Sequence, residues 1–270
     1  MYRKLLAASA IVAFLSFPEE VLSWMGKTHK WLAQEAVEFL PQDEKSFFED
    51  YRTSLFKGCV DADKYRRKHH VYFSDNRRVI DDSAASFARD RGEEAIRIIH
   101  EARKKGVVTE RDKQLFAELS GCSVHLVSDM HGLHTVSDED QLLHTELERE
   151  VDSRVGRVVG EGFYSSDFDL RFDGTLRKRD PYTAVIEMAR LSHFGKGKIL
   201  SAVELQDHIP MGKYGDGTYT GFSKWDLEIR MSVQRTLNRQ ANLSAEVLNY
   251  LYIRAFVDPI DVVALQNAHE

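Results

Sequence analysis

Histidine and carboxylate residues recur at a four-residue spacing in two stretches of this sequence. His125 and Asp129 form the first pair, and His144 and Glu148 form the second. On a helix this spacing puts both side chains on one face, with Cβ atoms about 5–6 Å apart. Imidazole and carboxylate groups are ligands that suit zinc. Two such pairs on neighbouring helices therefore indicate a metal site rather than two coincidental pairs on solvated helix faces.

Other residues of the same types lie near these pairs and upstream of them. Gly132 is expected to break the first helix, so that His134 can turn back toward the second pair. Upstream, Asp61 and Asp63 precede two adjacent histidines, His69 and His70, although the Lys/Arg run between them is also typical of a charged, solvated turn. Closer to the N-terminus, His29 precedes an amphipathic stretch. These positions are further candidate ligands.

The first 23 residues are predicted to be a signal peptide. Two cations within residues 1–4 precede the uncharged, apolar stretch 5–17, which is too short to span a bilayer. Val21 and Ser23 suit the −3 and −1 positions of a cleavage site, and cleavage would make Trp24 the first residue of the mature domain, 24–270. A buried N-terminal helix or an uncleaved anchor is the alternative. The signal peptide predicts a secreted protein, periplasmic or extracellular.

The rest of the chain is predicted to be one all-α, multi-helix domain. Apolar residues recur every three to four positions in several stretches, whereas alternating strand patterns are scarce. The predicted helices cover residues 30–40, 93–104, 110–130, 139–154, 183–194 and 243–257. Asn242 or Ser244 is expected to cap the last of these helices. The stretches around 155–182 and 205–222, rich in Gly, Asp and Tyr, are expected to be long loops.

Composition limits the class of protein but does not select a function. The 270 residues are 43% hydrophobic and 30% charged, which is ordinary for a soluble globular domain. The formal net charge is −6, so the chain has no overall basic field to attract nucleic acid. Cys59 and Cys122 are the only cysteines; one disulfide and two free buried thiols are both compatible with the sequence.

Taken in order, the candidate ligands resemble those of a known family. A mature N-terminal Trp, a His soon after it, Asp then His, His–x3–Asp with a following His, and His–x3–Glu occur in one order between residues 24 and 148. This order is similar to that of the zinc-dependent phospholipase C family, within a superfamily that includes the fungal single-strand zinc nucleases. Residues 149–270 add no recognised motif.

The resemblance implies three zinc ions in a cleft of an all-α domain. Each ion is assigned to residues by matching position. The first is assigned to Trp24, through its free α-amino group and main-chain oxygen, with His29 and Asp129. The second is assigned to Asp63, His70 and His125, with Asp129 bridging. The third is assigned to His134, His144 and Glu148.

Three of these assignments have alternatives within the sequence. The segment after Asp129 is one residue shorter than is usual in the family, so His131 is the fallback for His134. Asp61 could replace Asp63, and His69 could replace His70. Asp63 and His70 are preferred because the family histidine usually precedes an apolar run with Tyr and Phe, as after His70.

The resemblance also implies the reaction. Zinc lowers the pKa of bound water toward about 7 and stabilises charge on a phosphoryl group, and Asp63 is the candidate to orient or deprotonate the attacking water. Phospholipid is the expected substrate, reached by transient contact with a membrane surface. Nucleic acid is the substrate if the chain is instead a single-strand nuclease. A non-catalytic, metal-stabilised binding module is the third hypothesis. Nothing in the sequence indicates the oligomeric state.

Overall fold

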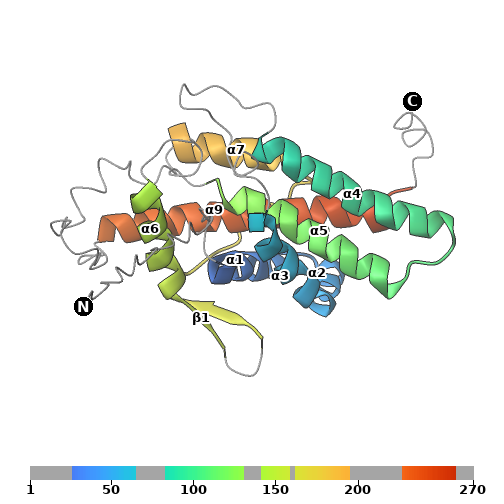
Figure 1. Ribbon diagram of the computed structural model, residues 1–270, viewed down its shortest axis with the longest axis horizontal. Helices are drawn as coiled ribbons and strands as arrows, with labels where there is room; N and C mark the ends of the chain where they lie inside the picture. The colour runs from blue at the N-terminus through green and yellow to red at the C-terminus, as the bar shows by residue number, and fades with distance from the viewer. Residues whose placement is uncertain (1–25, 65–82, 131–140, 159–161, 195–226, 260–270) are drawn as a thin grey trace, which may run out of the picture.

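The computed structural model describes residues 26–64, 83–130, 141–158, 162–194 and 227–259, without the side chains of 141–146, 193–194 and 228. In this part of the chain the structure is helical apart from one small sheet, which confirms the all-α prediction. Figure 1 shows α4, α5, α7 and α9 running along the long axis of the molecule, with α1, α2 and α3 beside α5. None of the described helices is long and apolar enough to cross a membrane.

The described elements fall into three groups along the chain. The first group is α1 (Gly26–Glu38), α2 (Gln42–Asp50), α3 (Arg52–Asp61) and the 3₁₀ turn η1 (Ala62–Lys64). The second group is α4 (Ala84–Lys104), α5 (Glu110–Ser128) and α6 (Gln141–Ser153). The third group is the strands β1 (Val155–Arg157) and β2 (Tyr164–Ser166), α7 (Pro181–Phe194), α9 (Leu227–Tyr252) and the π-helical turn η3 (Ile253–Val257).

Local sequence explains where α5 begins. The Thr109 hydroxyl accepts a hydrogen bond from the Asp112 amide, and the Asp112 carboxylate accepts one from the Thr109 amide. This reciprocal arrangement is a capping box, which satisfies amide donors that have no partner at a helix N-terminus. The helix then ends one residue before Asp129, which still has helical φ and ψ. His125 and Asp129 therefore keep the one-turn relationship expected from their spacing.

Two hydrophobic clusters hold the helices together. The larger one lies among α1, α2, α3, α4, α5, α7 and the C-terminal half of α9, and includes the fully buried Phe48, Phe116 and Leu126. The smaller one joins α1, α6, the hairpin and the N-terminal half of α9 around the buried Trp31 and Leu147. Because α1 and α5 carry the first and the central candidate ligands, both clusters contribute to their placement.

The packing of α3 on α5 is unusually close because two glycines face the opposite backbone. A Cβ on Gly58 would lie 1.8 Å from the carbonyl oxygen of Glu118, and a Cβ on Gly121 would lie 2.1 Å from that of Leu55. Cys59 and Cys122, the residues that follow these glycines, are buried and both are free thiols. Burial raises the pKa of Cys59 and raises that of Cys122 to about 12, so both thiols are protonated at neutral pH.

The structure corrects three expectations about the elements. Residues 243–257 are the end of α9, which begins at Leu227, so Asn242 and Ser244 lie inside a helix and cap nothing. The Asn242 side chain instead donates to the Arg171 carbonyl and accepts from the Asp173 amide, each at 2.9 Å. These hydrogen bonds hold residues 171–173 along α9. The hydropathy pattern of the sequence does not reveal this contact.

The other two corrections concern short elements. The expected loop 155–182 contains the antiparallel β1–β2 hairpin, in which Gly156 is opposite Ser165. Helices α2 and α3 were not predicted, because each spans ten residues or fewer and shows too little periodicity in isolation. The other expected loop, 205–222, lies outside the described residues.

Candidate metal centre

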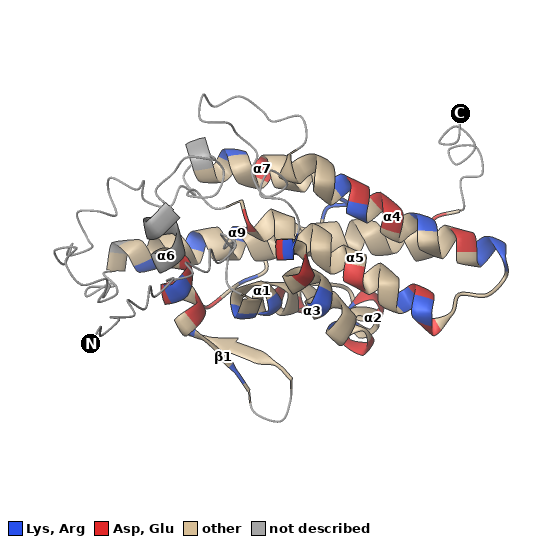
Figure 2. Ribbon diagram, viewed as in Figure 1, with Lys and Arg blue, Asp and Glu red and all other residues tan. Residues whose placement is uncertain are grey.

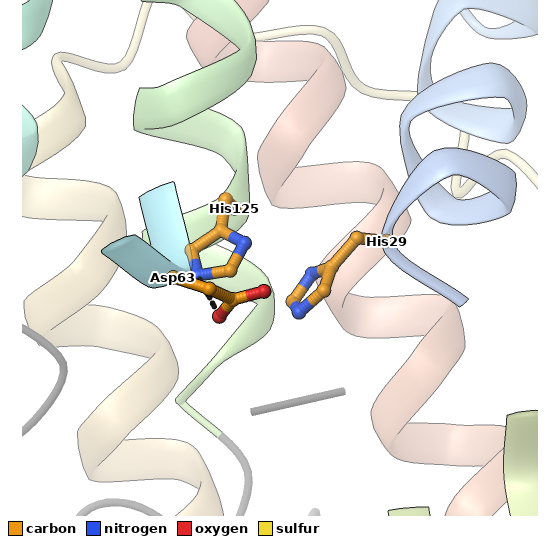
Figure 3. A group of neighbouring side chains, drawn as sticks. All are labelled: His29, Asp63 and His125. Carbon is orange, nitrogen blue, oxygen red and sulfur yellow. Dashed lines mark ion pairs between the residues drawn. The ribbon is translucent and has the colours of Figure 1, made fainter. Parts of the chain in front are cut away.

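Three elements bring candidate ligands together near the middle of the molecule. His29 lies on the first turns of α1, Asp63 on η1 and His125 on the last turn of α5. One ligand atom from each of these side chains lies within 4.8 Å of the other two, a grouping that could hold a metal ion. Figure 3 shows the two imidazoles and the carboxylate facing a common space.

Asp129 joins this group and contacts both imidazoles. Its Oδ2 lies 3.1 Å from Nε2 of His125, and its Oδ1 lies 3.5 Å from Nε2 of His29. Asp63 Oδ1 is 3.4 Å from the same Nε2 of His125. The two imidazole rings are stacked, with centroids 4.0 Å apart. One carboxylate thus spans two imidazoles that come from helices far apart in the sequence.

Hydrogen bonds on the far side of each ring decide which nitrogen faces the carboxylates. His125 Nδ1 lies 2.6 Å from the Cys59 carbonyl, which can only accept, so Nδ1 carries a proton. His29 Nδ1 lies 2.7 Å from the Ser128 hydroxyl, whose own proton is donated to the His125 carbonyl at 2.8 Å. His29 Nδ1 must therefore donate as well. In their neutral forms, both rings direct the Nε2 lone pair toward the carboxylates, as metal-binding histidines require.

The separations of these atoms fit a zinc ion. Two ligand atoms that each lie about 2.1 Å from one tetrahedral ion are about 3.4 Å apart. Three pairs in the group, at 3.1, 3.4 and 3.5 Å, are close to this value and exceed the 2.7–2.9 Å that is usual for a direct charge-assisted hydrogen bond, while the ligand atoms of His29, Asp63 and His125 together lie within 4.8 Å. Nitrogen and carboxylate oxygen are also the donor types that zinc accepts.

The electrostatics of the group call for a cation. His29, His125 and Asp129 side chains are fully buried, and an isolated buried carboxylate is costly. Although burial opposes protonation, the carboxylates of Asp129 and Asp63 raise the pKa of His125 to about 9. A bound metal ion would supply the positive charge that otherwise comes from that proton.

The remaining predicted ligands are placed only in part. Glu148 lies on α6 and is fully buried. His144 lies on the same helix, but its side chain is not described. Trp24, His70 and His134, with the alternatives His69 and His131, lie outside the described residues. Asp61, the alternative to Asp63, forms ion pairs with Lys57 at 3.1 Å and Lys64 at 2.6 Å instead of facing His125.

Residues that position the ligands were not evident from the sequence. Ser128 contacts His29, and the side-chain amide of Gln240 on α9 donates to the Ser128 carbonyl. Asp152 on α6 accepts hydrogen bonds from the amide and hydroxyl of Thr28, at 3.1 and 3.2 Å. The hydrogen bonds between Thr28 and Asp152 tie α6, the helix that carries Glu148, to the start of α1 beside His29. Ser128 and Asp152 carry no sequence signal, because their roles depend on neighbours more than 90 residues away.

The comparison with known protein families agrees with this geometry. A search of curated proteins gives no match to the chain. A model of the family described as zinc dependent phospholipase C matches residues 28–183, which is more than half of the chain and includes every predicted ligand except Trp24. The order of the ligands, the helical fold and this match lead to the same conclusion: the chain belongs to the zinc-dependent phospholipase C family.

Proposed function

We propose that this protein is a secreted zinc-dependent hydrolase that cleaves phosphodiester bonds in phospholipids. The observation that carries the proposal is the convergence of two oriented imidazoles and two carboxylates from α1, η1 and α5. Family membership supports zinc-dependent phospholipase C-type function and a lipid substrate. Secretion is supported by the signal peptide expected over residues 1–23.

In this proposal His29, Asp63, His125 and Asp129 would hold zinc, and Asp129 would be shared between the sites of the two histidines. The contacts of Asp129 with both imidazoles support the sharing. The full set of three ions requires the other residues matched by family resemblance, which are Trp24, His70, His134, His144 and Glu148. The burial of Glu148 supports its role, because a buried carboxylate is normally paired or bound to metal.

The exposure of the carboxylates separates their roles. The Asp63 side chain is 32% exposed, whereas that of Asp129 is fully buried. Asp63 is thus the carboxylate that water and a substrate phosphate can approach, and we assign it to orient the attacking water and accept its proton. Zinc bound at this site would lower the pKa of water and neutralise charge on the phosphoryl oxygens.

Hydrolysis then follows the stoichiometry of a phosphodiester cleavage. The water oxygen forms a new bond to phosphorus, and the bond from phosphorus to the alcohol oxygen breaks. The departing alcohol takes up a proton, so that one water is consumed for each alcohol and phosphomonoester formed. For a phospholipid cleaved on the glycerol side, these products are diacylglycerol and a phosphorylated head group.

A paired substrate assay tests the proposal. The zinc-loaded protein should release phosphorylated head groups from phosphatidylcholine vesicles and should hydrolyse bis-p-nitrophenyl phosphate. Asp63→Asn should reduce both rates at least about a hundredfold, within the usual range for loss of a general base. Asp61→Asn is the matched control, because that carboxylate pairs with lysines, and it should retain most activity.

Three results would contradict parts of the proposal. Cleavage of single-stranded DNA with no release from lipid would replace the substrate. Zinc binding without turnover of any phosphodiester would favour a binding module. Equal loss in the two Asp variants would remove the assigned role of Asp63.

A further inference from the structure

A second concave site lies between α1, α3 and the β1–β2 hairpin. It is a pocket of about 550 Å³, and none of the four side chains of the metal cluster lines it. Four basic residues line this pocket, together with one acidic residue, Asp61. The basic residues are Lys30, Arg52, Lys57 and Arg157. Figure 2 marks basic residues on each of the three elements.

Most of the positive charge in this pocket is not neutralised by the described part of the protein. Lys57 forms ion pairs with Asp61 and Glu118, and Asp61 also pairs with Lys64. Among the described residues, no acidic side chain forms an ion pair with Lys30, Arg52 or Arg157. Three like charges around one hollow repel one another, although the whole chain has a net charge of −6. This arrangement favours a bound anion.

Arg52 provides a more specific indication. Its guanidinium carbon lies 3.9 Å from the centre of the Phe163 ring, which fixes the plane of the group. Its Nη1 is shielded from solvent and has no hydrogen-bond partner among the described residues. The guanidinium makes no hydrogen bond to a described residue, so the part of it that lines the pocket is available to donate to an anionic oxygen there.

The walls of the pocket are held in place without a ligand. Gln34 on α1 donates to the Tyr164 carbonyl at 2.9 Å and accepts from the Tyr164 amide at 2.8 Å. The Tyr164 ring packs edge-on against Phe56 of α3, with ring centres 5.7 Å apart. These contacts fix the hairpin against both helices, so that the basic residues do not need to be assembled by the ligand.

We propose that this pocket binds an organic phosphomonoester. Arginine guanidinium groups match the geometry of phosphate oxygens. A phosphomonoester carries about −1.5 to −2 charges at pH 7, so it neutralises three basic side chains better than a ligand with a single carboxylate would. The volume is that of a small-molecule site rather than of a bare ion, and the Tyr164 and Phe56 rings offer an apolar wall for the organic part. The site does not depend on the hydrolysis proposed above.

The phosphomonoester can belong to a lipid or to a soluble molecule, and two binding measurements distinguish these sources. The first is calorimetric titration with glycerol 3-phosphate. The second is sedimentation with phosphatidylcholine vesicles that contain phosphatidic acid, or phosphatidylserine at matched surface charge. Saturable binding of glycerol 3-phosphate indicates a soluble ligand, whereas selective binding to phosphatidic acid vesicles alone indicates a lipid.

Variants link the binding to the pocket. Arg52→Gln and Arg157→Gln should each weaken the observed binding by about tenfold or more, as expected for loss of one charge-assisted contact. Replacing Arg52 could disturb its packing on Phe163. Arg157 is exposed, so Arg157→Gln removes a charge from the pocket without disturbing the core. Arg97→Gln removes an arginine from α4 that pairs with Glu101, and it should bind like the wild type.

The zinc content and the bis-p-nitrophenyl phosphate rate of Arg157→Gln should be unchanged, which separates this site from the metal cluster. The proposal is overturned if neither probe binds, or if phosphatidylserine binds as well as phosphatidic acid. It is also overturned if Arg157→Gln and Arg97→Gln behave alike.

Discussion

Replacing Gly58 by alanine should move α3 away from α5 and weaken the metal site. The new Cβ would lie 1.8 Å from the Glu118 carbonyl oxygen, about 1.2 Å short of the 3.0 Å below which Cβ contacts are essentially never found. The obstacle is helix backbone, which cannot turn aside as a side chain can. The two helices must therefore separate by roughly the missing distance.

That separation breaks a contact that orients His125. Its Nδ1 lies 2.6 Å from the carbonyl of Cys59, the residue after Gly58. A displacement of about 1.2 Å along this direction would leave nearly 4 Å, beyond hydrogen-bond range. Because Asp63 follows on the same segment, its carboxylate would also move relative to His125. Loss of such an orienting contact typically costs about 10–100-fold in metal affinity.

Gly58→Ala is expected to destabilise the protein, although glycine-to-alanine substitutions in helices usually stabilise. Glycine to alanine inside a helix normally stabilises by about 1 kcal/mol. Here overpacking costs about 1–3 kcal/mol, and a lost buried hydrogen bond costs a further 1–3 kcal/mol or so. The net result for Gly58→Ala should be a loss of about 1–5 kcal/mol in the free energy of unfolding.

Urea unfolding after EDTA treatment, elemental analysis for zinc and bis-p-nitrophenyl phosphate turnover together measure these effects. Gly156→Ala on β1 is the matched control, because its nearest neighbour to a new Cβ is the Ser165 hydroxyl at an ordinary 3.5 Å. This control should change stability by no more than about 0.5 kcal/mol. If Gly58→Ala keeps wild-type stability and zinc content, the close helix contact does not set the site.

Three further predictions concern the ligands, pH and processing. Ser128→Ala should lower zinc affinity about 10–100-fold, measured by competition with a chelator, because His29 Nδ1 loses its acceptor; unchanged affinity would contradict the orienting role. Burial raises the pKa of Glu44 from 4.5 to about 7, so the folded state holds its proton more tightly and this contribution to stability is lost as pH rises through 7. Glu44→Gln should therefore be more stable than the wild type at pH 8, by about 1 kcal/mol after allowance for solvent screening, and nearly equal to it at pH 4 in urea unfolding; a constant difference across pH would refute this. Secreted protein should begin at Trp24, and a version with one extra residue before it should hold less zinc, because an amide nitrogen has no available lone pair; equal zinc content and rate would exclude the N-terminal ligand.

The sequence determined the features that depend on residues close together in the chain. A spacing of four on a helix places His125 and Asp129 on one face because the helix repeats every 3.6 residues. The start of α5 follows from local capping by Thr109 and Asp112. The order of ligand types also led to the family, because that order survives however the helices pack.

Tertiary structure decided which side chains meet. Asp61 and Asp63 are equivalent by residue type, but only the 3₁₀ turn after α3, held against α5 through Gly58, directs Asp63 to His125 while Asp61 pairs with lysines. Asn242 is a favourable helix-cap residue by type, yet it lies inside α9, where its side-chain amide binds the backbone of Arg171 and Asp173. The basic pocket unites α1, α3 and a hairpin about 100 residues further along the chain. Such contacts depend on how close the backbones approach in three dimensions, and no local periodicity records that distance.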